Sequence, residues 1–147
     1  MILYLDTSDL FKLYVSEDDS PRVRSNAAGA SRLASSRFAY VEMHSALSRA
    51  YRNGRLSQID APVDQQGYER LVRQFRRDWR FYVKSSLSQP LLETASDLAA
   101  KHGLRAGDAV HLASAMILRD SALDEVRISV ADSHLRTGAV SEGFVVV

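Results

Sequence analysis

The chain has 147 residues, of which 46% are hydrophobic and 25% are charged, and its 19 Lys and Arg nearly balance its 18 Asp and Glu. This composition is that of an ordinary folded domain and excludes wholesale disorder and collagen-like repeats. Cysteine is absent, which excludes disulfide scaffolds, thiolate zinc sites and cysteine nucleophiles.

Hydrophobic patterning predicts short strands that alternate with helices. The continuous apolar run over residues 2–5 is typical of a strand buried on both faces. Further strands are predicted at 32–35, 80–87, 126–130 and 144–147. Helices are predicted at 7–14, 23–30, 36–53, from Pro62 onward, and at 88–103, 108–118 and 133–141. This alternation predicts an α/β fold with a parallel sheet covered by helices on both sides.

The N-terminus lacks the features of a targeting segment. Its apolar run ends at Asp6 and no basic residues precede it, whereas a signal peptide needs a longer apolar stretch and a membrane span needs about 20 apolar residues. We therefore expect a single domain over residues 1–147 that stays in the cytoplasm.

Four acidic residues occupy unusual places in this pattern. Asp6 and Asp132 follow predicted strands, and ligand sites of open α/β sheets lie beyond the carboxyl ends of the strands. Asp108 stands at the start of a predicted helix, and Glu42 lies in the first turns of another, between apolar neighbours. The pattern therefore predicts that at least two of these acids share one edge of the sheet.

Each acid also has a simpler explanation. An Asp after a strand commonly caps a turn, Asp108 would serve as a helix N-cap, and Glu42 would pair with Arg49 or His44 on the surface. If the four carboxylates converge near 6 Å, each pair repels by roughly 3 kcal/mol at an effective dielectric of about 20. Such a cluster must take up protons or bind a cation. Oxygen ligands favour Mg²⁺ or Mn²⁺, and such an ion beside a phosphate promotes phosphodiester hydrolysis.

Four segments in order resemble the PIN-domain ribonucleases, in particular the VapC-type toxins of bacterial toxin–antitoxin modules: residues 5–14, 40–42, 103–115 and 131–135. The resemblance implies a three-layer α/β/α sandwich with a central parallel sheet. It implies a metal-dependent endoribonuclease with four catalytic acids, Asp6, Glu42, Asp108 and Asp132. Asp6 and Asp108 would be the principal ligands of Mg²⁺, with Mn²⁺ as a substitute. It also implies an RNA substrate, a cognate antitoxin and a homodimer.

Three positions refine this comparison. Thr7 or Ser8 would supply a supporting hydroxyl near the metal. Val130 stands where the family often has Thr or Ser two residues before the fourth acid, so that hydroxyl contact is missing here. Gly107 stands where a larger residue is common, which predicts a mobile loop before the third acid.

An arginine strip is a further candidate site. Arg70, Arg73, Arg77 and Arg80 follow one another at spacings of three, four and three residues, which places them on one helix face. Nine basic and four acidic residues lie between positions 49 and 84. The strip is either a solvated helix face or a surface that binds RNA phosphates.

Other functions compete with the nuclease. A non-catalytic PIN-like module that binds RNA or protein would share the fold, and a phosphatase would use Asp6 as its nucleophile but needs an acid where Ser8 stands. His111 lies in an apolar helix three residues after Asp108, and we predict a packed or hydrogen-bonded core side chain rather than an acid–base catalyst.

Overall fold

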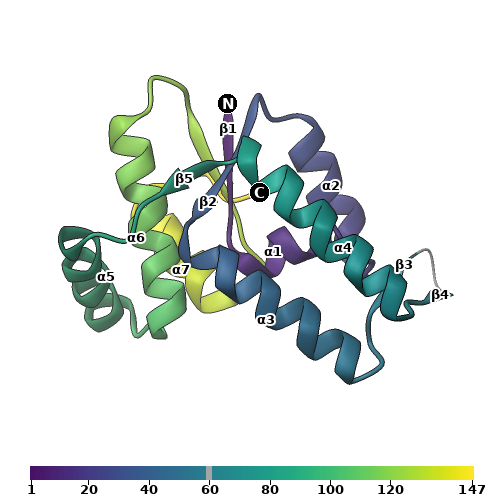
Figure 1. The fold of residues 1–147 in the computed structure, drawn as a ribbon. Coiled ribbons are helices and arrows are strands. Elements are labelled where there is room, and N and C mark those ends of the chain that lie inside the picture. The colour runs from purple at the N-terminus through teal and green to yellow at the C-terminus, as the bar shows by residue number, and fades with distance from the viewer. Residues whose placement is uncertain (59–60) are drawn as a thin grey trace.

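Four parallel strands form the central sheet of the computed structural model, which describes residues 1–58 and 61–147. β1 (Ile2–Leu5) lies between β2 (Arg32–Ser36) and β6 (Val126–Ser129), and β5 (Val83–Ser85) pairs with β2 at the edge. The order is β5-β2-β1-β6, and every neighbouring pair is parallel. The carboxyl ends of all four strands therefore meet at one edge of the sheet (Figure 1).

Helices connect these strands and cover both faces of the sheet (Figure 1). Their bounds are α1 (Thr7–Lys12), α2 (Ser20–Ala28), α3 (Phe38–Arg52), α4 (Gln65–Asp78), α5 (Gln89–His102), α6 (Ala106–Ser121) and α7 (Ser133–Ser141). A 3-10 turn, η1 (Trp79–Phe81), precedes β5, and β3 (Ser57–Gln58) pairs with β4 (Ala61–Pro62) in a small antiparallel ribbon. No helix in the described part of the chain is long and apolar enough to cross a bilayer.

The alternation of side chains along β1 creates two hydrophobic cores. Ile2 and Tyr4 pack in a core that includes buried residues of α5, α6 and α7. Leu3 and Leu5 point the other way and pack against residues of α1, α2, α3 and α4. The chain is thus a three-layer α/β/α sandwich, as predicted, and the apolar run of β1 is buried on both faces.

Three predicted elements are wrong in their bounds. The strand predicted at 80–87 is shorter, because Trp79–Phe81 form η1 and the strand β5 covers only Val83–Ser85. Pro62 does not open a helix but lies in β4, and α4 begins at Gln65, because Asp64 caps that helix with its side chain. The predicted strand at 144–147 reduces to one bridge between Ile128 and Val146. The apolar C-terminal run is β-like in composition, yet it contributes little to the sheet beyond the edge of β6.

A buried ion cluster fixes α1 to its neighbours. Asp9 is fully buried and accepts from Lys12 Nζ at 2.9 Å, Arg22 Nη2 at 3.1 Å and Ser129 Oγ at 2.6 Å. These partners belong to α1, α2 and β6. The cluster therefore holds the start of α1, and with it Asp6, against the carboxyl end of β6.

Candidate functional site

Asp6 and Asp132 lie at the carboxyl edge of the sheet, where both also cap helices. Asp6 Oδ1 accepts the backbone N–H of Asp9 at 2.8 Å, which caps α1. Asp132 Oδ1 accepts the backbone N–H groups of His134 and Leu135, both at 2.9 Å, which caps α7. The capping interpretation is thus confirmed for both acids. Since each cap uses only Oδ1, the second oxygen of each carboxylate remains outside the cap.

Asp108 approaches Asp132 across a shared guanidinium. It lies in the first turn of α6 but is not the N-cap, which is Arg105 and makes no side-chain cap. The N-cap interpretation of Asp108 is therefore wrong. Arg105 Nε lies 3.5 Å from Asp108 Oδ2, and its Nη2 lies 3.8 Å from Asp132 Oδ2. One exposed cation thus faces two of the four predicted acids.

Glu42 is tied to the same edge from α3. Its Oε2 accepts the hydroxyl proton of Thr7, the residue after Asp6, and lies 2.8 Å from His111 Nε2. The predicted surface pairs are wrong: Arg49 contacts Ser45 instead, and His44 packs among aromatic rings. The supporting hydroxyl predicted at Thr7 or Ser8 is that of Thr7, and it contacts an acid.

His111 is a site residue that the sequence indicated only as a core side chain. It is 3% exposed, as predicted, but its Nε2 lies 3.0 Å from Thr7 Oγ1 as well as 2.8 Å from Glu42. Its Nδ1 lies 3.0 Å from the Tyr4 hydroxyl. A neutral ring that donates from Nε2 to the carboxylate accepts the Tyr4 proton at Nδ1. The signal that could have found it is its position three residues after Asp108, which places both on one face of α6.

Gly107 allows α6 to approach Glu42 closely. A Cβ at Gly107 would lie 3.3 Å from Glu42 Oε1 and 3.6 Å from the Phe38 ring. A larger side chain would therefore crowd the carboxylate. Gly107 is also helical, as the second residue of α6, so the predicted mobile loop before Asp108 is wrong.

The four acids differ in how readily they ionise. Burial raises the pKa of Asp6 to about 7, and burial together with the charge of Asp132 raises the pKa of Asp108. Backbone N–H donors, that of Leu135 above all, lower the pKa of Asp132. Burial alone would raise the pKa of Glu42, but hydrogen bonds from His111 and Thr7 bring it below its usual value. The edge therefore combines two acids whose ionisation is favoured, Glu42 and Asp132, with two acids whose ionisation is opposed by burial, Asp6 and Asp108.

This donor set suits a hard divalent cation in chemistry but is not a closed metal cage. Carboxylate oxygens are the ligands that Mg²⁺ and Mn²⁺ prefer, and a cation would favour the ionised forms of Asp6 and Asp108. Within residues 1–58 and 61–147, however, no three His, Asp or Glu side chains are gathered closely enough to hold a metal ion. Binding would therefore require these side chains to draw together around the ion.

Three members of the arginine strip lie on α4, as predicted, while Arg80 lies on the 3-10 turn η1 that follows this helix. The four members of the strip are exposed, namely Arg70, Arg73, Arg77 and Arg80. Leu71 and Phe75 are buried on the opposite face. Among the described residues, none of the strip lines the hollow beside Glu42, where Arg49 is the cationic residue. One of the four acids in the positively charged segment 49–84, Asp60, lies outside the described residues.

Comparisons with known proteins agree with this arrangement. The sequence profile of the PIN domain family matches residues 3–136. Ribonuclease VapC45 and Ribonuclease VapC49, both from Mycobacterium tuberculosis, are each 33% identical over 146 residues, covering 97% of this chain and 92% of the relative. A solved toxin-antitoxin complex from Klebsiella pneumoniae contains a chain of similar fold, with a TM-score of 0.60 at 16% identity, covering 89% of this chain and 87% of that one.

Proposed function

Because this chain belongs to the PIN-domain family and to its VapC-type ribonucleases, we propose that it is a Mg²⁺-dependent endoribonuclease and the toxin of a toxin–antitoxin pair. One observation carries the proposal beyond the family. Arg105 lies between Asp108 and Asp132, while Glu42 contacts Thr7, the residue after Asp6, and His111, three residues after Asp108. Carboxyl groups whose pKa values are raised by burial and by a neighbouring acid, as for Asp6 and Asp108, are typical of functional sites.

We assign the metal to Asp6 and Asp108, with Glu42 and Asp132 completing the site directly or through water. Mn²⁺ would substitute for Mg²⁺. When bound, such an ion activates a water molecule and stabilises negative charge on the phosphate.

The chain's own residues then hold Glu42 ionised and in place beside the attacking water. His111 and Thr7 bind Oε2 and favour the ionised carboxylate. Oε1, the oxygen next to Gly107, is left to accept a hydrogen bond from the water and so to orient it. The arginine strip would bind RNA phosphates that lie away from the cleavage site. Such contacts position the strand and do not depend on its sequence.

The proposal is tested by incubating purified protein with single-stranded RNA in Mg²⁺, in Mn²⁺ and in EDTA. We expect cleavage with either metal, none in EDTA, and none from Asp6→Asn or Asp108→Asn. Sequencing the ends of the fragments identifies the cut. Equal cleavage in EDTA would contradict the metal mechanism. Retained RNA binding without any cleavage would favour the alternative, a non-catalytic binding module.

A toxin that cleaves RNA in the cytoplasm of its own cell needs an inhibitor, and we propose that a cognate antitoxin places an Arg or Lys among the acids. Arg105 already pairs with two of them at 3.5 and 3.8 Å, so the edge accepts a guanidinium. The co-purified complex should bind Mg²⁺ more weakly than free toxin. Equal affinity would mean that the antitoxin blocks RNA binding instead.

Sedimentation should give twice the 16.4 kDa chain mass if the free toxin is the expected homodimer.

A further inference from the structure

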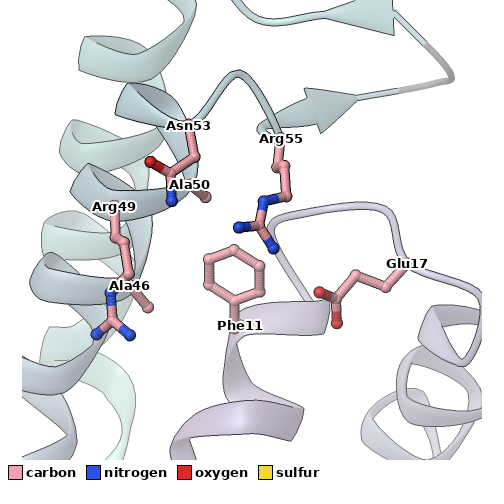
Figure 2. Close-up of a pocket in the computed structure, with 7 residues that line it drawn as sticks. All are labelled: Phe11, Glu17, Ala46, Arg49, Ala50, Asn53 and Arg55. Carbon is pink, nitrogen blue, oxygen red and sulfur yellow. The ribbon is translucent and has the colours of Figure 1, made fainter.

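A cleft of about 340 Å³ lies next to the candidate site, between α1, the end of α3 and the loop after α1 (Figure 2). Phe11 stands in its middle, on α1. The remaining walls are Glu17, Ala46, Arg49, Ala50, Asn53 and Arg55. Its size is at the lower end of the range of about 300–1,000 Å³ that is typical of small-ligand sites.

A second hollow lies next to this cleft, beside Glu42. It is lined by Thr7, Ser8 and Glu42 among others, and the two hollows share Ala46 and Arg49. Arg49 follows Glu42 by seven positions on α3, which is two helical turns or about 10 Å. The Phe11 cleft is therefore adjacent to the hollow beside Glu42, with Arg49 in the wall of both.

The chemistry of the cleft is that of a nucleotide site. Figure 2 shows the Phe11 ring projecting into the space, with the Arg55 guanidinium and the Glu17 carboxylate both directed toward it. Phe11 is only partly buried, and Arg49, Asn53 and Arg55 are exposed. Arg55 makes no ion pair with any carboxylate of the described residues. An aromatic face, cationic groups and hydrogen-bonding side chains are the features that bind unpaired bases and their phosphates.

We propose that this cleft binds the base of a nucleotide that neighbours the scissile phosphate of single-stranded RNA. The inference rests on the proposed function, because it assumes that a single strand of RNA is bound at the acidic site. Phe11 stacks on the base, Arg49 and Arg55 contact the flanking phosphates, and Glu17 with Asn53 contacts the base edge. A carboxylate accepts from an exocyclic amino group, so a base that carries one is favoured over uracil.

Charge and shape favour this occupant over a protein segment. Two guanidinium groups against one carboxylate attract the phosphates of an RNA strand, and an exposed aromatic ring offers a stacking surface for a base. Cytosine, adenine and guanine can use both the ring face of Phe11 and the Glu17 carboxylate at once. The adjacent hollow is lined by Glu42, where a phosphodiester must lie for cleavage.

The test uses short unstructured RNAs in which one adenine is replaced by 2-aminopurine, at a different position in each RNA. Fluorescence is measured as metal-free protein is added, because stacking on an aromatic ring quenches this base. We expect quenching at one position next to the cut, lost in Phe11→Leu and retained in Phe11→Tyr. Arg55→Ala should weaken RNA binding about ten-fold without changing Mn²⁺ binding.

Matched controls lie at the opposite edge of the sheet. Arg32→Ala, at the start of β2, and Leu123→Ala, at a fully exposed position before β6, should leave binding and quenching unchanged. If Phe11→Leu does not fold, Arg55→Ala and Asn53→Ala, both at exposed positions, decide the matter.

The outcomes separate this inference from the proposed function. Unchanged RNA affinity and unchanged quenching in Phe11→Leu and Arg55→Ala overturn the base site, even where cleavage with metal persists. If the same variants lose antitoxin binding alone, the cleft is a protein-docking site and the inference is also overturned. A parent protein that neither binds nor cuts RNA overturns the proposed function itself.

Discussion

At the scale of single residues, Asp6 combines two roles with opposite effects on stability. Its carboxylate caps α1 through Asp9, but burial raises its pKa from 3.8 to about 7. A carboxyl whose pKa is raised on folding destabilises the protein increasingly as pH rises above 3.8, until the effect levels off above about 7. The full effect is roughly 4 kcal/mol.

We therefore expect Asp6→Asn, which keeps a capping side chain, to be more stable than the parent at pH 8 in EDTA. The difference should vanish toward pH 4. Urea unfolding across this pH range measures it. Asp132→Asn is the matched control with the opposite sign, because its pKa is lowered on folding and the lost charge should destabilise the protein at neutral pH. A destabilised Asp6→Asn at pH 8 would contradict the buried, uncompensated charge.

His111 is a positioning residue in this account, since it touches Glu42 and not the RNA. His111→Ala should lower kcat about 10–100-fold, as loss of such an orienting contact does, with little change in RNA affinity. His111→Gln retains an N–H donor and should recover part of the loss. Single-turnover cleavage at several concentrations of folded protein measures the cleavage rate and the RNA affinity separately. Equal losses in both variants would assign His111 to packing alone.

Residue contacts of this kind were the least predictable part of the site. The placement of Asp6 and Asp132 follows from the ends of two strands, so the sequence indicates it directly. The partners of Glu42 lie 35 and 69 residues away, at Thr7 and His111, and no local pattern specifies them. Arg105 was missed because its exposed side chain resembles any surface arginine.

At the scale of elements, α4 presents the arginine strip on a face that is separate from the acids. The contribution of the strip to RNA binding can be measured separately from metal binding at the acids. Arg73→Ala combined with Arg77→Ala should weaken RNA binding and reduce the slope of log K against log salt by about 0.7 per lost phosphate contact. Fluorescence anisotropy at several salt concentrations measures the slope, and Mn²⁺ affinity should not change. An unchanged slope would mean that the strip is a solvated face. Both arginines are exposed, and their ion pairs are long: Arg73 lies 3.9 Å from Glu69 and Arg77 lies 3.5 Å from Asp78.

Most elements were predictable because their signals are local. The strands of the sheet and the helix from Ser88 to Gly103 follow from apolar runs, a cap and a glycine in the left-handed region. The start of α4 was not predictable, because Pro62 and Asp64 are both helix-start signals and lie only two residues apart. The C-terminal strand was predicted too long, because the run pairs with the edge strand β6 only through the bridge between Ile128 and Val146.

At the scale of the whole molecule, the fold places an acidic edge between two layers of helices. The Asp9 cluster holds α1 on one side of that edge, and α6 brings Asp108 and His111 from the other core. Neither layer carries the site alone, because Glu42 comes from α3 and its partner His111 from α6. The candidate site therefore depends on the packed sandwich and not on a local motif.

The central claim is that Asp6 and Asp108 bind a divalent ion. Electron paramagnetic resonance of Mn²⁺ titrations at pH 8, above the pKa of about 7 for Asp6, tests it most directly. We predict that the parent protein binds Mn²⁺ and that Asp6→Asn and Asp108→Asn each bind it at least about ten-fold more weakly. Asp124→Asn, exposed at the opposite edge of the sheet, should bind like the parent. Equal Mn²⁺ affinity in all four proteins would contradict the account.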